Sequence, residues 1–215
     1  MIAALMAAHL AHATPTETVW VGHQIVHGSQ PVPFLGELET HTESYLLARV
    51  TRDGDTLLIE QRACAVSFSE TFGVAVAISP ETLRQLPETR IRFSVAADNT
   101  AQAEPWAVAW DSADIDGDSS PGATVTVRHR MCSGELHVAS TTTSTASSAQ
   151  LTSGGLTGEI AVVVDQQILG ASRACLTLIG DEQHDRQQGN FAYVPVDSGV
   201  TCDDLDTDQW PVRAQ

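Results

Sequence analysis

The feature that most constrains the fold of this chain is a two-residue alternation of apolar and polar side chains that recurs between residues 18 and 196. A period of two places successive side chains on opposite faces of a strand. The alternating segments are short and end at turn residues, as at Asp53-Gly54, a dipeptide typical of a β-hairpin. Because no strand–helix–strand rhythm interrupts them, the pattern predicts an all-β chain and disfavours a parallel α/β sheet.

Sequential hairpins favour an antiparallel meander. A meander closes naturally as an up-and-down, calycin-like barrel, here of about 8–10 strands, and a β-sandwich is the alternative. One short helix is expected after Ser79, a favoured N-cap residue that precedes Pro80, and Pro87 ends this helix within two turns. No long linker divides the chain, so residues 14–215 are expected to form a single β-domain.

Polar segments are harder to assign from periodicity. The Ser/Thr/Ala run at residues 140–150 fits either an exposed strand or a flexible loop. The segment from Leu169 to Ile179 predicts a further strand, and the polar residues 180–190 after it predict a loop.

The chain is strongly acidic, with 27 Asp and Glu residues against 11 Lys and Arg residues and a formal net charge of −16. A surface of this charge repels nucleic acids and anionic membranes, so neither is an expected partner. The charge suits solubility and cation binding. Beyond the N-terminus, no apolar segment is long enough to predict a transmembrane helix.

The N-terminal segment MIAALMAAHLAHA carries an apolar stretch of about ten residues, which is too short to span a bilayer. It ends in Ala11-His12-Ala13, an A-x-A-type cleavage site, although it has no basic residues at its start. Residues 1–13 are therefore predicted to be a signal peptide, and an N-terminal helix that frays is the alternative. Export implies a secreted or periplasmic protein, and association with an outer membrane is one form that this localisation can take.

The four cysteines contain no C-x-x-C pair, which disfavours a zinc knuckle and a thioredoxin-type motif. In an exported chain, an even number of cysteines predicts two disulfides, and four buried thiols are the alternative. Of the three possible connectivities we favour Cys64–Cys202 with Cys132–Cys175. Cys202 lies in a polar tail that needs attachment to the body, and Cys132 and Cys175 flank one run of strands.

The most specific chemical signal is an acidic stretch between residues 110 and 126, WDSADIDGDSSPGATVT. It carries four closely spaced carboxylates, from Asp111, Asp114, Asp116 and Asp118. The last three have the i, i+2, i+4 spacing of the first ligands in calcium loops, where six to eight oxygens surround the ion. We therefore predict these four residues as calcium ligands in a structural site.

The acidic stretch is not an EF-hand. Ser119 stands where an EF-hand has glycine, Val125 stands where it has a bidentate glutamate, and no helix is expected on either side. In local sequence it is closer to the D-x-D-G-D loops of dockerin-like and thrombospondin-type repeats. The alternative is a solvated acidic turn, since Pro121-Gly122 is sufficient to shape one. A second acidic run, at residues 203–208, is interpreted as a solvated tail.

A broader pattern extends around this loop: DIDGDSSPGATVTV, then SGELHVA and QQILGAS, with LLIEQRACAV upstream and TCDDL near the end. From about residue 36 onward the chain loosely resembles uncharacterised secreted proteins and lipoproteins of myxobacterial type. Their loop reads D-x-D-G-D-G-x-P-G-x-T and precedes a Gly-Glu-apolar-aromatic-Val strand. This chain departs from them at Ser119 and His137, where they tend to have Gly and Tyr. The resemblance implies export and a β-rich fold, and it brings no activity.

Aromatic and histidine residues give weaker candidates. Trp106 and Trp110 abut the acidic stretch and are a candidate platform for a sugar or another ligand, although core packing is the favoured interpretation. His23 and His27 on one strand would lie about 13 Å apart, too far for one metal. His129 and His137 form a weak candidate pair across the hairpin at residues 133–134.

Three functional hypotheses fit the sequence. The favoured one is an exported, non-catalytic β-barrel protein with a structural calcium loop, which binds a small apolar ligand in its interior. The second is a calcium-stabilised cell-surface interaction module with a filled core. The third is a secreted hydrolase with an unrecognised carboxylate site, for which no G-x-S-x-G, H-E-x-x-H or nucleophilic-cysteine motif is present.

Overall fold

Eleven strands dominate the chain, and a computed structural model describes them over residues 16–32, 36–70, 73–176 and 182–215. The predicted signal peptide, residues 1–13, lies outside the described residues. The elements are β1 (Thr16–Val32), β2 (Gly36–Asp53), β3 (Thr56–Phe68), β4 (Ala75–Ile78), α1 (Pro80–Gln85), β5 (Thr89–Val95), β6 (Thr100–Ala103), β7 (Trp106–Trp110), β8 (Ala123–Arg128), β9 (Gly134–Thr152), β10 (Gly155–Ala171), β11 (Glu182–Val196), and the short 3₁₀ helices η2 (Cys202–Asp204) and η3 (Thr207–Gln209).

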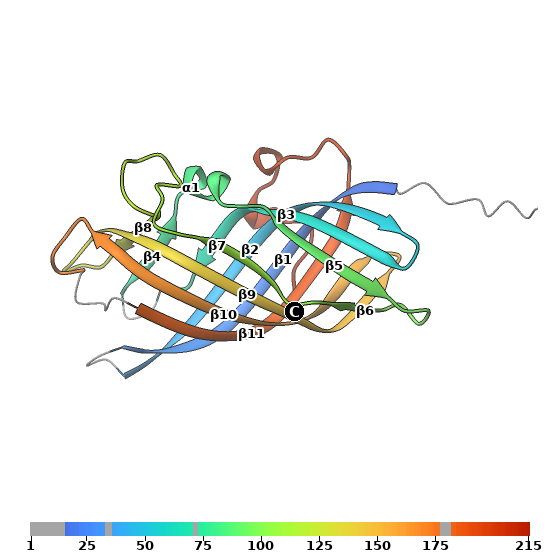
Figure 1. Cartoon of the computed structure of the whole chain (residues 1–215), viewed down its shortest axis with the longest axis horizontal. Helices are drawn as coiled ribbons and strands as arrows, with labels where there is room; N and C mark the ends of the chain where they lie inside the picture. Colours follow the sequence, from blue (N-terminus) through green and yellow to red (C-terminus); the bar gives the residue numbers. More distant parts are fainter. Residues whose placement is uncertain (1–15, 33–35, 71–72, 177–181) are drawn as a thin grey trace, which may run out of the picture.

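The strands form one antiparallel sheet that closes on itself (Figure 1). Neighbouring strands follow the order β10-β11-β1-β2-β3-β5-β6-β9, and pairing of β9 with β10 completes a ring of eight. The ring has the barrel-like architecture that the meander pattern predicts, and it leaves no long free edge within the ring. The predicted all-β class with one short helix is confirmed.

The long strand β9 organises the other half of the sheet. Its edge opposite β10 pairs in turn with β8, with β7 and with β6. Strand β4 pairs with β8 outside the ring. The loop between β7 and β8 therefore begins and ends at strands that are both paired with β9. Strand β9 thus fixes both ends of the acidic stretch.

Two of the polar segments belong to strands. The Ser/Thr/Ala run 140–150 lies within β9. The predicted loop at 180–190 is wrong for residues 182–190, which form the first part of β11, and the strand predicted over 169–179 is wrong for residues 172–176, where the chain turns. The reason is that β11 lies between β1 and β10, whose backbones supply hydrogen-bond partners whatever side chains β11 carries.

The helix α1 forms as the sequence predicts. The Ser79 side chain accepts a hydrogen bond from the Thr82 N–H at 3.0 Å, so it is the N-cap, and Pro80 occupies the first turn. The helix ends at Gln85, before Pro87. Its buried Leu83 anchors it, and Thr82 reaches the acidic loop.

Apolar side chains from every strand of the ring fill its interior. Phe93, Leu57 and Ile59 are fully buried in this main cluster, where Phe191 and Tyr193 also pack. Each large buried side chain contributes about 1.5–3 kcal/mol through removal of apolar surface from water. A second cluster lies beneath β4, β8 and β9. A third lies on the outer surface of the ring, where the C-terminal tail covers it.

The third cluster and a disulfide attach the tail. Trp210 is buried on the outside of the ring against Val21 and Tyr45. Cys64 is bonded to Cys202, and Cys132 is bonded to Cys175, which is the connectivity favoured from the sequence. A polar tail is thereby held on the barrel by one covalent bond and by burial of one large aromatic side chain.

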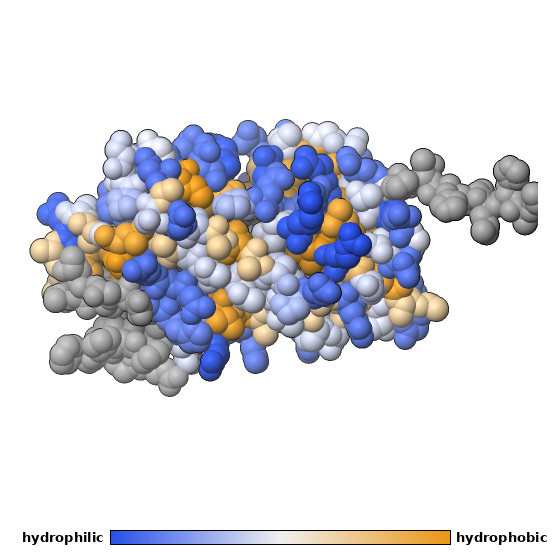
Figure 2. Space-filling view, in the orientation of Figure 1, coloured by the Kyte–Doolittle hydropathy of each residue, from blue (hydrophilic) through white to orange (hydrophobic). Residues whose placement is uncertain are grey.

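The surface is mostly hydrophilic. Figure 2 shows polar side chains over most of one face, with small and separate apolar patches between them. Among the described residues, Met131 is the large apolar side chain that is mostly exposed, at 77 %. Within the same residues, no helix has the length and the hydropathy needed to cross a membrane.

Candidate metal centre

Three carboxylates converge in the loop between β7 and β8. Asp114, Asp116 and Asp118 each offer an oxygen that lies within 4.8 Å of the oxygens offered by the other two. The backbone is wound tightly here, with positive φ angles of 75° at Gly117 and 71° at Ser119. The winding brings alternate side chains to one side of the loop, which is the geometry that the i, i+2, i+4 spacing predicts.

Asp114 holds the loop in this shape. Its two carboxylate oxygens accept hydrogen bonds from the Gly117 N–H at 2.7 Å and the Ser119 N–H at 2.9 Å. Ser119 occupies a left-handed conformation that suits glycine. The hydrogen bonds that Asp114 accepts help to hold a serine in that conformation.

Asp116 links the loop to the body of the protein. Its Oδ2 accepts hydrogen bonds from the Thr124 N–H of β8 at 2.8 Å and from the Thr82 hydroxyl of α1 at 3.1 Å. Its Oδ1 is buried and has no hydrogen-bond partner. An unpaired buried carboxylate oxygen is costly, and a bound cation is one of the few groups that would satisfy it.

Asp118 completes the group of three. It accepts hydrogen bonds from the Thr124 hydroxyl at 2.6 Å and the Ser120 N–H at 2.7 Å. The hydrogen bond from Thr124 is the main cause that lowers the pKa of the Asp118 carboxyl, and the bond from Ser120 adds to it. The carboxylate therefore stays ionised over the range in which a cation would bind.

The neck of the loop is closed by two backbone hydrogen bonds. The Gly122 N–H donates to the Ala113 carbonyl and the Ile115 N–H donates to the Gly122 carbonyl, both at 3.1 Å. Gly122 has a φ of 74°, and a Cβ atom there would lie 2.3 Å from the Val138 carbonyl oxygen of β9. Glycine is therefore required for both conformation and space, and the loop is held in place before any ion binds.

The other predicted acidic residues lie apart from this group. Asp111 is exposed, and its Oδ1 accepts a hydrogen bond from the Ala113 N–H at 2.8 Å. It does not belong to the cluster of Asp114, Asp116 and Asp118. In the second acidic run, Asp204 caps η2 by accepting hydrogen bonds from Thr201, which lowers the pKa of its carboxyl.

The two tryptophans beside the loop pack inward on β7. Trp106 packs against the main cluster, with its ring centroid 6.5 Å from that of Phe93. Trp110 packs against the second cluster, and its indole N–H donates to the Val138 carbonyl at 2.9 Å. This arrangement corresponds to the core-packing interpretation, and the indole of Trp110 supports the strand that leads into the loop.

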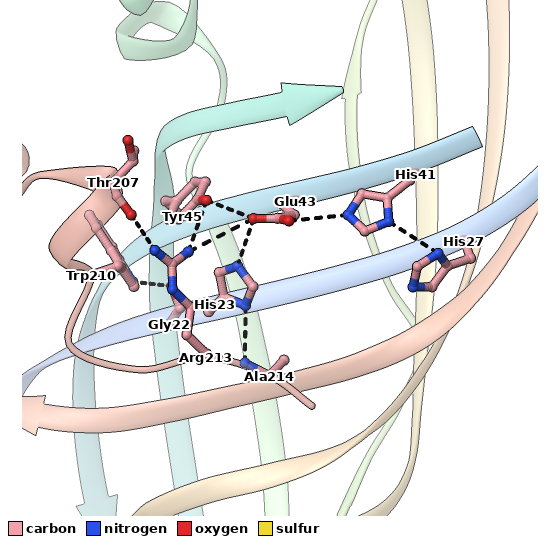
Figure 3. A network of polar contacts seen from close by, with 10 residues as sticks. All are labelled: Gly22, His23, His27, His41, Glu43, Tyr45, Thr207, Trp210, Arg213 and Ala214. Atoms are coloured by element: carbon pink, nitrogen blue, oxygen red, sulfur yellow. Dashed lines mark hydrogen bonds and ion pairs between the residues drawn. The ribbon is translucent and has the colours of Figure 1, made fainter. Parts of the chain in front are cut away.

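A polar network that the sequence did not predict lies on the outer face of β1 and β2 (Figure 3). At its centre, Glu43 accepts hydrogen bonds from the Tyr45 hydroxyl at 2.7 Å and from His41 Nε2 at 3.1 Å, and it lies 3.4 Å from His23 Nε2. These contacts, that from Tyr45 first, lower the pKa of Glu43 to about 2, so it is a carboxylate at neutral pH. The guanidinium of Arg213 lies 3.8 Å from the same carboxylate.

The C-terminal tail contributes the rest of this network. The Ala214 N–H donates to His23 Nδ1 at 3.0 Å, and the Trp210 indole donates to the Gly22 carbonyl at 2.9 Å. His23 is only 2 % exposed, and burial is the main cause that lowers its pKa. A neutral imidazole with its proton on Nε2 satisfies both contacts, because Nδ1 then accepts from the tail while Nε2 donates to Glu43.

Strand register explains which histidines meet. β1 and β2 pair so that His27 lies opposite His41 and His23 lies opposite Tyr45. His27 and His23 both lie on the outer face, but His27 contacts His41 whereas His23 contacts Tyr45 and Glu43. The predicted pairing of His129 with His137 is wrong, because His137 pairs with Thr124 in the β8–β9 register.

The register was the signal that sequence reasoning could have used. Partners in β1 and β2 have residue numbers that add to 68, as expected for two antiparallel strands that pair without a register shift. No local pattern predicts the tail contacts, since Trp210 and Gly22 are 188 residues apart.

A cavity of about 780 Å³ lies beside the exposed end of this network. His27, His41, Glu39, Thr40 and Gln187 are among the residues that line it. These side chains are polar, and Ala161, Val162 and Val163 form an apolar part of the lining. The cavity thus offers both polar and apolar contacts to a ligand.

The donor atoms of the acidic loop define its chemistry. Three carboxylates with no imidazole or thiolate are the ligand set of hard cations such as calcium and magnesium, and they are a poor set for softer metals. The cluster is partly exposed, which leaves room for water ligands. In comparisons with known proteins, no family model, no curated protein and no solved structure matches this chain.

Proposed function

We propose that this chain is an exported, non-catalytic β-barrel protein stabilised by a calcium ion in the loop between β7 and β8. The observation that carries the proposal is the Asp116 Oδ1 atom, which is buried in a group of three carboxylates and has no hydrogen-bond partner. Calcium would satisfy that oxygen and would offset the repulsion among Asp114, Asp116 and Asp118.

A structural role fits the position of the loop. Asp116 already joins α1 to β8 through Thr82 and Thr124, so an ion there would strengthen the link between these two elements. The remaining ligands would be waters, backbone carbonyls or Asp111. Calcium is favoured over magnesium because it accepts irregular sets of six to eight oxygens, whereas magnesium requires near-octahedral geometry.

Export is supported by the two disulfides, because such bonds persist in oxidising compartments. The A-x-A segment that ends at Ala13 also supports export.

The second candidate function is a calcium-stabilised cell-surface interaction module with a filled core. This function is favoured over binding of a small apolar ligand because side chains of the main cluster, such as Phe93, Leu57 and Ile59, occupy the ring interior.

Thermal unfolding with and without calcium tests the proposal. The protein is dialysed against a chelator and then titrated with calcium, and a separate titration uses magnesium. Calcium at 100 times its dissociation constant should raise the free energy of unfolding by about 2.7 kcal/mol, with a matching rise in Tm. A Tm that does not respond to millimolar calcium would contradict the site.

Matched variants locate the effect. Asp116→Asn keeps the shape of the side chain and removes its charge, so it should abolish the calcium-dependent part of Tm even if it also lowers the calcium-free Tm. Asp203→Asn removes a charge from the exposed second acidic run and should leave the calcium response intact. Asp111→Asn tests the fourth predicted ligand. If Asp116→Asn retains the full calcium response, the ion binds elsewhere.

A further inference from the structure

Two histidines form a pair at the end of the outer polar network. His27 of β1 and His41 of β2 are direct cross-strand partners, and their ring centroids lie 4.5 Å apart with an interplanar angle of 77°. The two Nδ1 atoms point toward each other at 3.2 Å (Figure 3). His27 is exposed and the His41 side chain is 33 % exposed, so the space around these nitrogens is open to solvent.

Glu43 fixes which nitrogen of His41 is free. An ionised carboxylate can only accept hydrogen bonds, so His41 Nε2, 3.1 Å from Glu43 Oε1, must carry a proton. The lone pair of a neutral His41 is therefore on Nδ1, the atom that faces His27. Histidine ligands of metals commonly donate their second N–H to a carboxylate in this way, which orients the ring and makes the free nitrogen more basic.

Glu43 is itself held from several directions. The Tyr45 hydroxyl donates to it at 2.7 Å, and the Arg213 guanidinium, 3.8 Å away, also donates to the Tyr45 oxygen at 2.9 Å. The carboxylate that orients His41 therefore has little freedom to move. A ligand held by such support is prepared for binding before the metal arrives.

The spacing of the two nitrogens fits a shared metal. Nitrogen ligands lie about 2.0–2.1 Å from zinc, and two of them at the tetrahedral angle would be about 3.3–3.4 Å apart. The observed 3.2 Å corresponds to an N–metal–N angle of about 103° at those bond lengths. The separation of the two Nδ1 atoms therefore already matches that of two ligands of one ion.

We propose that His27 and His41 bind a divalent transition-metal ion of the borderline class, such as zinc or copper, through their Nδ1 atoms. Glu43 is the positioning residue of this site. Two imidazoles leave at least two coordination positions of such an ion open, and both histidines line the adjoining cavity of about 780 Å³. The site can therefore hold a metal together with water or with an oxygen or nitrogen group of a small polar ligand.

The proposed site is independent of the acidic loop. Imidazole nitrogen selects zinc and copper, whereas the carboxylates of Asp114, Asp116 and Asp118 select calcium. The two sites also lie on different strands, since the histidines belong to β1 and β2 and the acidic loop joins β7 to β8. Failure of one proposal consequently leaves the other standing.

Calorimetric titration of the full chain with zinc chloride tests the site, with calcium present in excess to occupy oxygen-only sites. One zinc should bind per chain. His27→Ala and His41→Ala should each weaken this binding more than tenfold, and Glu43→Gln should weaken it about tenfold, within the range of 10–100-fold for loss of a supporting residue. His184→Ala, which removes an exposed histidine paired with Asp165, should leave the affinity unchanged.

Histidine side-chain NMR identifies the ligands directly. Zinc should shift the Nδ1 signals of His27 and His41 and leave those of His184 in place, and circular dichroism checks that each variant folds. The proposal would be overturned by the absence of zinc binding at millimolar concentration. It would equally be overturned by zinc affinity that survives both His27→Ala and His41→Ala, or by shifts confined to other histidines.

Discussion

Removal of the Trp210 side chain should release the C-terminal tail from the barrel. This residue is 5 % exposed, and it packs on the outer face of the ring against Val21 and Tyr45, with the Tyr45 ring 5.3 Å away in an edge-to-face arrangement. Its indole N–H also donates to the Gly22 carbonyl of β1. Trp210→Ala deletes the largest apolar contact between the tail and the sheet.

The magnitude follows from burial. Replacement of a buried tryptophan by alanine costs about 3–5 kcal/mol, and loss of the hydrogen bond to Gly22 accounts for about 0.5–1.5 kcal/mol of that change. The disulfide between Cys64 and Cys202 still tethers the tail, so residues 205–215 can detach without global unfolding. The measured loss in global stability therefore equals the docking free energy of the tail, with about 3–5 kcal/mol as its upper limit.

Urea denaturation and hydrogen exchange measure the two consequences. The free energy of unfolding should fall in Trp210→Ala, and the Ala214 amide, which donates to His23, should lose its protection. Trp210→Phe retains an aromatic ring beside Tyr45 and should cost about 1–2 kcal/mol, from the lost hydrogen bond and the smaller ring. Met131→Ala changes an exposed side chain and should stay within about 0.5 kcal/mol of the parent.

The reasoning fails if Trp210→Ala matches Met131→Ala in stability and keeps its tail amides protected. Such a result would mean that the disulfide and the polar contacts of the tail are sufficient to dock it. A fall in stability without faster exchange in the tail would also contradict the argument, because it would place the loss in the barrel rather than in the docked segment.

Two further predictions concern pH and backbone conformation. Burial lowers the pKa of His23, so the unfolded chain takes up this proton at a higher pH than the folded chain does, and the free energy of unfolding should fall as pH drops below about 6.5. The contribution is at most about 1.4 kcal/mol per pH unit, and denaturation curves should show a flatter pH profile in His23→Gln. Gly122→Ala should cost more than about 2 kcal/mol, because it adds a clash with the Val138 carbonyl to a positive φ, whereas Gly117→Ala, with a positive φ and open space, should cost about 1 kcal/mol. Equal costs for the two glycine variants would show that the close approach to β9 is not restrictive.

The features that sequence predicted are those set by local chemistry. Alternation with a period of two predicted the all-β class, since one face of each strand packs inward. Ser79 and Pro80 predicted the start of α1 because an N-cap needs only the next few residues. The spacing of Asp114, Asp116 and Asp118 predicted their convergence for the same reason, as a loop of this length determines its own geometry.

The features that sequence missed depend on distant partners. Asp185 and Gln187 read as loop residues, yet they are buried in β11 because β1 and β10 lie on either side of it. The Ser/Thr/Ala run becomes part of β9 because β7 and β10 supply its hydrogen bonds. In a closed sheet, the position of a segment between two neighbours outweighs the polarity of its own side chains.

The same dependence connects the tail to the histidine pair. Glu43 accepts a hydrogen bond from His41 on one side and approaches Arg213 of the tail on the other. Release of the tail would remove the guanidinium and leave Tyr45 as the principal neutral donor that holds the carboxylate. The orientation of His41 then rests on fewer contacts. Docking of the C-terminal tail and preparation of the His27–His41 pair are therefore consequences of one outer polar network, assembled from β1, β2 and the tail.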